Sequence, residues 1–573
     1  MFHSFRRAAP AALALAITAS LTPAASAQQA SGAYLVGRQA MIESDYSAAA
    51  EYFTRALMRD TSNPALLENV VFAQLALGRL DRALPVAQQI EGLGLGSQIG
   101  HLALAAGEAQ AGSYKALAGR DVESRAISPL VDGLLTAWAQ MGAGSVSRAL
   151  ETFASLADEK GLRGFALYHW ALALASVGDF EGAEKMFAAD GGQLALVSRR
   201  AVVARAEVLS QLGRNDDALA MLDEAFGGRR DPGLADLVAR LETGGALPFT
   251  IAPEVQDGFA EIFFSVGAAL KGEAADDYVL IYARLASEMS ENHVDAVLLS
   301  AELLDQLGRY ELSVMTYKQV PQGHPDYHAA ELGRAEALRR AAKPDAAIEV
   351  LDQLTRDFPA LPDAYSALGD LLRQEEQYDA AAAAFDAALE FSPEEAPGRW
   401  YLYYSRGICH ERLKQWGEAE DDFRAALALN PDQPLVLNYL GYSLVEKRIK
   451  LDEALEMIER AVAARPESGY IVDSLGWVLY RLGRYEEAVS HMEKAVALMP
   501  VDPVVNDHLG DVFWAVGRKL EAEFQWKRAL SFVDPEDTDG EADPVRIRRK
   551  LNVGLDQVLE EEGAAPLTVA NDG

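Results

Sequence analysis

The sequence predicts an all-α fold, a solenoid in which antiparallel helix pairs stack into a right-handed superhelix. Three observations predict it. Small and large apolar residues recur about every 34 residues between residues 362 and 535, which is the length of one helix–turn–helix repeat. Alanine, the strongest helix former, is abundant along the chain. No segment carries the motifs of a strand-based nucleotide or hydrolase site. The recurring repeat positions and turn signatures indicate about 11 or 12 repeats, some of them degenerate.

Five units, beginning at Pro362, Trp400, Pro434, Gly469 and Pro503, repeat most clearly. In each unit position 8 is glycine, position 20 is alanine and position 24 is large, with one extra residue in the turn of the third unit. The glycines are Gly369, Gly407, Gly441, Gly476 and Gly510, and the large residues are Phe385, Phe423, Ile458, Met492 and Trp526. This spacing resembles the tetratricopeptide repeat.

The spacing has a physical cause. Each unit is expected to form two antiparallel helices, A and B, which cross where positions 8 and 20 lie, and only small residues allow so close an approach. Large residues at positions 4, 7 and 24 fill the remaining space, and proline at position 32 ends helix B. Because no unit can bury its apolar face alone, neighbouring units must stack.

The N-terminal half repeats more loosely, and two regions, residues 91–130 and 227–260, do not follow the 34-residue spacing. The second is rich in Gly and Pro, so we expect an irregular link there between two solenoids. The expected organisation is a signal peptide (1–27), a degenerate solenoid (28–226), the link (227–260), a regular solenoid (261–535), and an acidic linker, capping helix and disordered tail (536–573).

The first 27 residues read as a secretory signal. Arg6 and Arg7 precede an apolar run that is shorter than a bilayer span, and Ala25-Ser26-Ala27 provides a cleavage site after Ala27. No cysteine near this site could accept a lipid, and no later stretch is apolar enough to span a membrane. We therefore expect an exported protein that begins at Gln28 in a bacterial periplasm.

Composition excludes several function classes. The net charge is −34, from 86 acidic and 52 basic residues, which disfavours nucleic acid and anionic lipid as partners. The single cysteine, Cys409, cannot close an internal disulfide or build a cysteine-rich metal site.

Catalytic and metal-binding patterns are weak. Cys409 and His410 are neighbours on a predicted helix, where adjacent side chains point about 100° apart. His324 and His328 have metal-ligand spacing, but Pro325 lies between them and no carboxylate–histidine motif accompanies them. We expect no enzyme activity, no metal and no cofactor.

The most informative residues lie at positions 2, 5, 9, 12 and 13 of helix A, which in this fold line the inner, concave face. The residues found there are Tyr401, Tyr404, Asn438, Tyr442, Tyr470, Asp473, Trp477, Tyr480, Asp507, Asp511 and Trp514. Seven of these eleven are Tyr or Trp, a composition typical of binding hot spots. The alternative is that these rings pack against neighbouring helices or the terminal cap.

The same positions indicate the chemistry of the partner. Carboxylates occupy sites where a carboxylate-clamping groove would carry Lys and Asn, and they would repel such a ligand. We expect a protein or peptide segment that is basic or aromatic-rich, bound as a helix or an extended strand. A homodimer formed end to end is left open.

The stretches Leu437–Tyr442 and Asp473–Arg484, with Asp507–Asp511, resemble exported bacterial tetratricopeptide proteins over about residues 360–530. One branch of these consists of outer-membrane lipoproteins that act as adaptors for a periplasmic carboxy-terminal-processing protease and deliver cell-wall hydrolases to it. This chain lacks the lipidated cysteine of that branch. The resemblance implies a periplasmic adaptor. The alternative is a structural scaffold for envelope polysaccharide or outer-membrane assembly.

Overall fold

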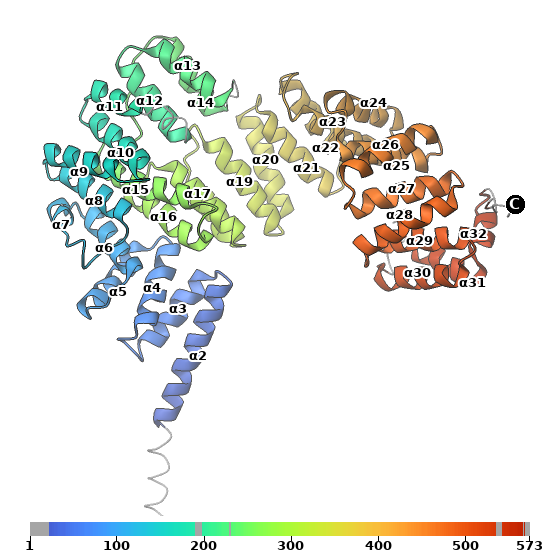
Figure 1. Ribbon diagram of the computed structural model, residues 1–573, viewed down its shortest axis with the longest axis horizontal. Coiled ribbons are helices and arrows are strands. Elements are labelled where there is room, and N and C mark those ends of the chain that lie inside the picture. Colours follow the sequence, from blue (N-terminus) through green and yellow to red (C-terminus); the bar gives the residue numbers. More distant parts are fainter. Residues whose placement is uncertain (1–21, 190–197, 228–230, 535–540, 565–566, 568–573) are drawn as a thin grey trace, which may run out of the picture. The chain divides into compact units, whose positions relative to one another are not determined.

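The computed structural model describes residues 22–189, 198–227, 231–534, 541–564 and 567. These residues form 31 helices and no β-strand, which confirms the all-α prediction (Figure 1). No helix in this part of the chain is long and apolar enough to cross a membrane. Of the predicted signal peptide, residues 1–21 lie outside the described residues and 22–27 begin the first helix.

The chain divides into two compact units, residues 1–358 and 359–573. The first unit contains α2 (Thr22–Ile42), α3 (Tyr46–Leu57), α4 (Pro64–Ala76), α5 (Leu80–Gly92), α6 (Gln98–Gln110), α7 (Tyr114–Ala118), α8 (Pro129–Gly142), α9 (Val146–Asp158), α10 (Arg163–Ser176), α11 (Phe180–Phe187), α12 (Arg199–Gln211), α13 (Asn215–Phe226), α14 (Pro232–Glu242), α15 (Val255–Leu270), α16 (Asp276–Met289), α17 (Val294–Gln306), α18 (Tyr310–Tyr317), α19 (Tyr327–Arg340) and α20 (Pro344–Asp357). The second contains α21 (Pro362–Gln374), α22 (Tyr378–Phe391), α23 (Arg399–Arg412), α24 (Trp416–Leu429), α25 (Pro434–Glu446), α26 (Leu451–Ala464), α27 (Gly469–Arg481), α28 (Tyr485–Leu498), α29 (Pro503–Ala515), α30 (Lys519–Phe532), α31 (Pro544–Val553) and α32 (Leu555–Glu561).

Local sequence explains where the helices begin and end. Pro434 and Pro503 occupy the first helical position, where a missing N–H costs nothing, and Asp502 caps α29 by accepting a hydrogen bond from the amide of Val505. Tight turns between helices A and B place Gly483 in the left-handed region, at φ 77°. Consecutive helices therefore reverse direction and pack as pairs.

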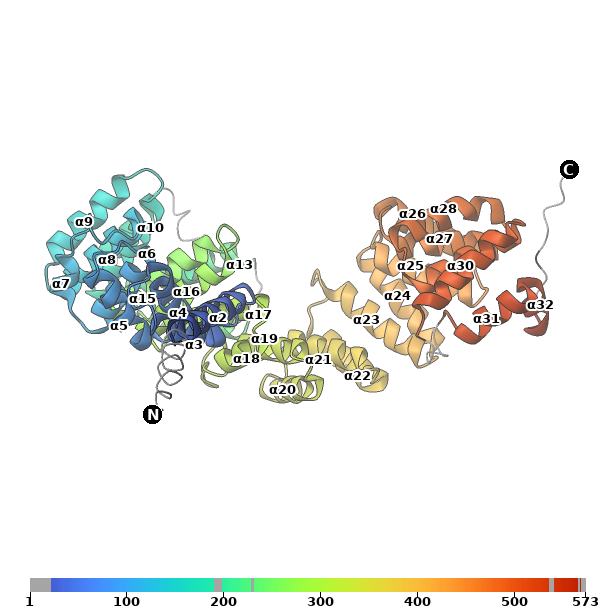
Figure 2. The same cartoon turned by 90° about the horizontal axis from the view of Figure 1, so that it is seen from below.

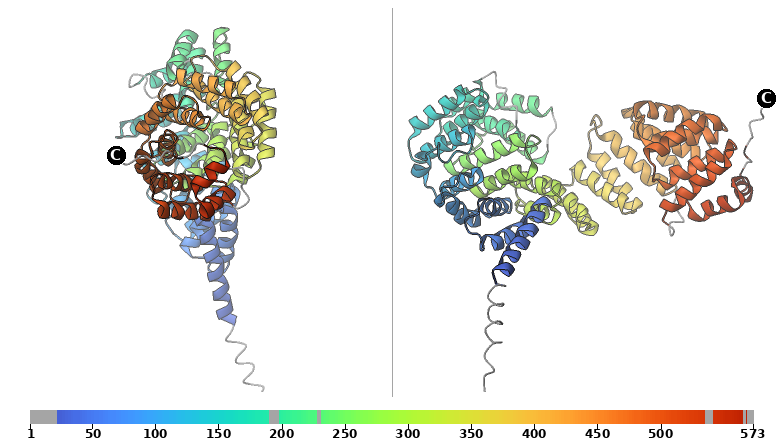
Figure 3. Two further views of the ribbon diagram at one scale, coloured as in Figure 1. Left: turned by 90° about the vertical axis from the view of Figure 1, so that its right-hand side faces the viewer. Right: turned by 60° about the horizontal axis from the view of Figure 1, so that its bottom comes forward.

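The inner side of the first unit is filled by its own chain. Helix α15 packs on α8 and α10, and α16 packs on α4 and α6, as Figure 1 and the right-hand view of Figure 3 show. Trp138 of α8, fully buried, presses its indole against Gly258 of α15. Glu261 of α15 is also buried, where it accepts hydrogen bonds from Tyr168 and Arg200. A carboxylate can be buried here because those donors satisfy it.

The structure places the division of the chain elsewhere than the expected link at 227–260. That segment lies inside the first unit, and part of it is helix α14. Residues 245–254 are irregular, but Ser210 and Glu207 of α12 hold them by hydrogen bonds to the amides of Leu247 and Thr250, at 2.9 and 2.8 Å. Residues 91–130, which also did not follow the repeat spacing, contain α6 and α7. Glycine and proline thus mark an irregular connection that is packed within one unit.

The second unit shows the physical cause of the repeat spacing directly. Each position-8 glycine lies against the position-24 side chain of its own unit: a Cβ on Gly369 would lie 2.9 Å from the ring of Phe385, and one on Gly510 would lie 2.4 Å from Trp526. The position-20 alanines have no exposed surface. Figure 2 shows α23 to α28 gathered in the orange part of the chain, and the A and B helices from α23 to α30 contact one another as pairs.

Two short helices follow the last repeat. Helix α31 packs on α30 and α32 packs on α31, seen in red in both views of Figure 3. Gly554, at φ 86°, separates them, so the structure has two short helices where the sequence predicted one capping helix within residues 536–573. Their buried side chains include Ile547 and Leu555.

The glycine contacts lead to a stability prediction. Gly510→Ala should lower the free energy of unfolding by about 1–3 kcal/mol, because its methyl group would overlap the rigid, fully buried indole of Trp526. Gly417→Ala is the matched control, since Gly417 lies in a helix of the same unit and a methyl group there would meet no described atom within 4 Å. Urea denaturation of both variants measures the difference, and equal stabilities would contradict the close contact.

Candidate functional site

The predicted inner-face residues fall into three groups by exposure. Tyr470 is 58% exposed. Five are half-buried: Tyr401, Tyr404, Asn438, Tyr442 and Trp514. Five are buried: Asp473, Trp477, Tyr480, Asp507 and Asp511. The expectation that all eleven are solvent-facing is therefore wrong for the last group.

Trp477 and Tyr480 are buried because the rings of successive helices stack on one another. The indole of Trp477 lies between Tyr480, at a centroid distance of 4.8 Å, and His508 of α29, at 3.9 Å, both nearly parallel to it. Its Nε1 donates a hydrogen bond to Glu446 of α25 at 2.7 Å. Trp477 and Tyr480 are each 8% exposed. Trp477 thus joins three consecutive A helices. For Trp477 and Tyr480 the structure therefore agrees with the alternative stated above, that the rings pack against neighbouring helices.

Asp507 and Asp511 are buried because a lysine from outside the repeats pairs with them. The Nζ of Lys550 on α31 lies 2.8 Å from Asp507 Oδ2 and 2.6 Å from Asp511 Oδ1, and the Lys550 side chain has no exposed surface. The Nε1 of Trp526 also donates to Asp511 Oδ1, at 2.9 Å. Both carboxylates are therefore compensated inside the protein.

His508 is held as a cation. Burial alone would lower the pKa of this imidazole, but the carboxylate of Asp473, whose Oδ2 lies 3.1 Å from Nδ1, outweighs burial together with Asp507 and Glu541. The pKa of His508 is raised to about 9. A protonated imidazole thus stacks on the face of Trp477, where a cation is favoured.

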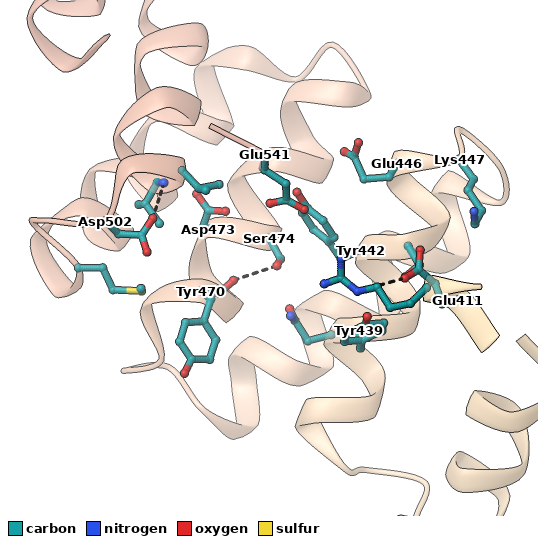
Figure 4. Close-up of a pocket in the computed structure, with 16 residues that line it drawn as sticks. Glu411, Tyr439, Tyr442, Glu446, Lys447, Tyr470, Asp473, Ser474, Asp502 and Glu541 are labelled. Carbon is teal, nitrogen blue, oxygen red and sulfur yellow. Dashed lines mark hydrogen bonds and ion pairs between the residues drawn. The ribbon is translucent and has the colours of Figure 1, made fainter. Parts of the chain in front are cut away.

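A pocket of about 400 Å³ opens on the inner face of the second unit, between α23, α25, α27 and α29 (Figure 4). It contains four of the predicted residues: Asn438, Tyr442, Tyr470 and Asp473. The structure thus brings together the centre of the predicted set. The other predicted residues lie outside this lining: Tyr401, Tyr404, Trp477, Tyr480, Asp507, Asp511 and Trp514.

The pocket carries an excess of negative charge. Its lining has five carboxylates and two cations: Glu411, Glu446, Asp473, Asp502 and Glu541 against Arg412 and Lys447. Burial and the neighbouring Glu541, Glu446 and Asp473 raise the pKa of Tyr442 well above its ordinary value. The Oδ1 of Asn438 is buried there without a hydrogen-bond partner in the described part of the chain. The pocket therefore offers acceptors to a ligand that brings donors or positive charge.

Several lining residues were missed by the sequence prediction. Glu411, Arg412 and Glu446 stand at positions 12 and 13 of their A helices, so the position rule could have found them. Ser443, Lys447 and Ser474 come from neighbouring turns of the same helices, and Met499, Asp502, Val504 and Val505 come from the turn before α29 and its start. Glu541 follows the last repeat, where no repeat pattern could place it on the inner face.

The geometry gives no support to a catalytic pair at Cys409 and His410 or to a metal site at His324 and His328. Burial raises the pKa of the Cys409 thiol to about 11, which disfavours the reactive thiolate. The Nδ1 of His410 hydrogen-bonds Gln415 at 2.7 Å. His324 and His328 each use Nδ1 for a local backbone hydrogen bond, to the amide of Asp326 and to the carbonyl of Pro325.

Family models described as tetratricopeptide repeat match residues 332–396, 400–433 and 440–503. Residues 332–503 therefore carry tetratricopeptide repeats. Such repeats generally form protein-interaction scaffolds, with extended concave binding surfaces. The match covers the α23–α28 part of the pocket.

Two relatives of known sequence each match a part of this chain. The TPR repeat-containing protein PA4667 of Pseudomonas aeruginosa is 31% identical over 169 residues, which are 29% of this chain and 28% of that protein. Human protein O-mannosyl-transferase TMTC1 is 24% identical over 182 residues, 30% of this chain and 20% of that protein. The matched stretches span less than a third of each relative.

Two solved structures align with nearly the whole chain at low sequence identity and low TM-score. The Cut9–Hcn1 hetero-tetramer of the APC/C aligns over 92% of this chain and 96% of that chain, with 15% identity and a TM-score of 0.38. Yeast Tom70 aligns over 93% and 99%, with 14% identity and a TM-score of 0.34. At these values the likeness extends to neither partners nor function.

The raised pKa of His508 predicts a loss of stability at alkaline pH. Because the folded pKa of about 9 lies above the ordinary value of 6.5, the stabilisation is complete below pH 6.5 and is lost as pH rises through 9. The loss should be on the order of 3 kcal/mol. Chemical denaturation between pH 6 and 10 measures it against His508→Gln, which lacks the titrating group. Parallel stability curves for the two proteins would show that His508 is not held as a cation.

Proposed function

We propose that the protein is a non-enzymatic adaptor that holds a segment of a partner protein in the inner-face pocket of its second unit. The observation that carries this proposal is the pocket itself: about 400 Å³ of space on the concave side of the A helices, lined by tyrosines and by more carboxylates than cations. An exposed ring such as Tyr470 has an apolar body and a polar tip, as binding anchors do.

The charge of the pocket favours a basic segment. Of its two cations, Lys447 lies over the ring of Trp416, with Nζ 4.7 Å from the centroid, and Arg412 lies 4.0 Å from Glu411. Neither cation pairs with Glu541, which lines the same pocket. A lysine or arginine of the partner would meet this excess of carboxylates, and its guanidinium or ammonium N–H groups could also donate to Asn438 Oδ1.

We further propose that the adaptor works in the periplasm and recruits a processing protease and its cell-wall hydrolase clients. The signal-like residues before Gln28 and the resemblance of Asp473–Arg484 to exported adaptors support this. Fractionation of cells that express the full chain, with N-terminal sequencing of the product, tests it: an unprocessed cytoplasmic product would refute the location.

A matched pair of variants tests the pocket. Tyr470→Ala should weaken binding of an arginine- and tyrosine-containing peptide at least tenfold without lowering the melting temperature, because Tyr470 lines the pocket and is 58% exposed. Phe524→Ala is the control, since Phe524 is also 58% exposed but lies on α30 outside this pocket. Fluorescence anisotropy measures binding of the peptide and of a counterpart with glutamate in place of arginine.

The proposal fails if the two variants bind alike, or if the glutamate peptide binds as tightly as the arginine peptide. Binding should also weaken as salt is raised, because four of the five pocket carboxylates are partly or fully open to solvent. Fragments that assign binding to one unit are best divided between Phe358 and Pro359, where the two compact units meet in the sequence. A fragment that ended at residue 226 would divide the first unit.

A further inference from the structure

We infer that Asp507 and Asp511 form a receptor for a basic side chain, and that the C-terminal segment, residues 541–562, is an exchangeable lid that fills this receptor with its own Lys550. The occupant that exchanges with the lid is a partner segment bearing arginine. The inference deepens the proposed function and rests on it, because it names the residue type by which the partner binds.

The receptor is built from two carboxylates one helical turn apart on α29. Lys550 reaches both of them, at 2.8 and 2.6 Å, and its Nζ also lies 5.7 Å from the centroid of the Trp526 ring. The aspartates are 3% and 2% exposed. An ammonium held by two carboxylates against an indole face is a fully formed cation site, and in this chain the cation is supplied from within.

Lys550 leaves one acceptor atom of this site without a hydrogen bond. The Oδ1 of Asp507 is buried and accepts no hydrogen bond from any described residue. Burial and the neighbouring Asp511 raise the pKa of Asp507, against the opposing effect of Lys550. The guanidinium of an arginine presents five N–H donors in a planar fork and could satisfy this oxygen as well as those that Lys550 reaches. A partner arginine therefore has a physical means to compete with Lys550.

The lid continues into the pocket described above. Glu541, at its start, lines this pocket beside Tyr442 in Figure 4. Arg546 follows, with its guanidinium 3.8 Å from Asp511. The lid thus runs over the A helices α25 and α29 from the pocket to the receptor. Its release would join the two into one longer acidic surface, on which Trp514, now hydrogen-bonded to Asp556 of the lid, becomes available.

The closest contacts within each hairpin do not involve the lid, although Ile547 and Leu555 of the lid share the buried core of the repeats. The contacts between position-8 glycines and position-24 side chains lie within each unit from α21 to α30. The pairs of Arg546 with Glu562 and Arg549 with Glu561 join residues of the lid to each other. Opening the lid would therefore expose the inner face of the last repeats while their hairpins keep their own packing.

Amide hydrogen–deuterium exchange on the intact wild-type protein tests directly whether an arginine peptide displaces the lid. The probe is a peptide with two arginines, and the control is the same peptide with citrulline, which keeps the shape and loses the charge. Saturating arginine peptide should raise the amide exchange rate of residues 544–561 at least tenfold, and the citrulline peptide should leave it unchanged. If the arginine peptide binds but the exchange of 544–561 stays as in the free protein, the lid is a fixed cap and the inference is wrong, while the proposed function stands.

Two variants separate the charge of Lys550 from the fold of the lid. Lys550→Met should raise exchange in 544–561 and tighten binding of the arginine peptide at least tenfold, because the receptor is then unoccupied. Arg549→Met is the matched control in the same helix, since Arg549 pairs only with Glu561 in the described structure, and it should leave peptide affinity within twofold. Adding Asp507→Asn to Lys550→Met should cancel the gain.

The outcomes are distinguishable. If Lys550→Met binds the arginine peptide no more tightly than wild type does, Asp507 and Asp511 are not a receptor for the peptide. If the wild-type protein does not bind the arginine peptide at all, the proposed function is wrong as well. If Lys550→Met unfolds the repeats, as reported by circular dichroism, the lid is part of the core and the inference is wrong.

Discussion

The contact between a glycine on helix A and a large side chain on helix B sets the geometry of the second unit. With no Cβ at Gly476 or Gly510, the two helices of a hairpin approach until Met492 or Trp526 touches the opposite backbone. That distance fixes the crossing of each pair, and the crossing fixes which side of every A helix faces inward. The pocket exists because α23, α25, α27 and α29 present the same side in succession.

The second organising feature is the use of scarce positive charge inside an acidic protein. Only 52 basic residues oppose 86 acidic ones, yet Lys550, His508 and Arg200 are all committed to partners in the interior or near it. Each buried charge would cost several kcal/mol without its partner. Each of these cations is removed from the surface together with its carboxylate partners, and the acidic character of the pocket comes from its own five carboxylates and two cations.

The repeat spacing was enough to predict the all-helical fold class and the close contact between the two helices of each hairpin, because these depend on contacts within 34 residues. Burial of Trp477 could not be predicted that way, since it depends on Glu446 in the preceding repeat and His508 in the following one. Asp507 and Asp511 were expected in solvent because Lys550 belongs to no repeat. The division of the chain was misplaced for a related reason: Gly and Pro at 227–260 report local irregularity, whereas a unit boundary depends on which distant helices touch.

The packing of α15 and α16 inside the first unit has a consequence for how the protein is made. A repeat array with contacts only between neighbours can acquire structure progressively as it leaves the ribosome. Here Gln110 bonds to the backbone of Glu288, 178 residues later, and Trp138 rests on Gly258. The early hairpins therefore wait, with apolar surface uncovered, until about 290 residues have been synthesised. Such long-range contacts slow folding and leave the apolar surface of the nascent N-terminal half open to aggregation for longer than that of the second unit.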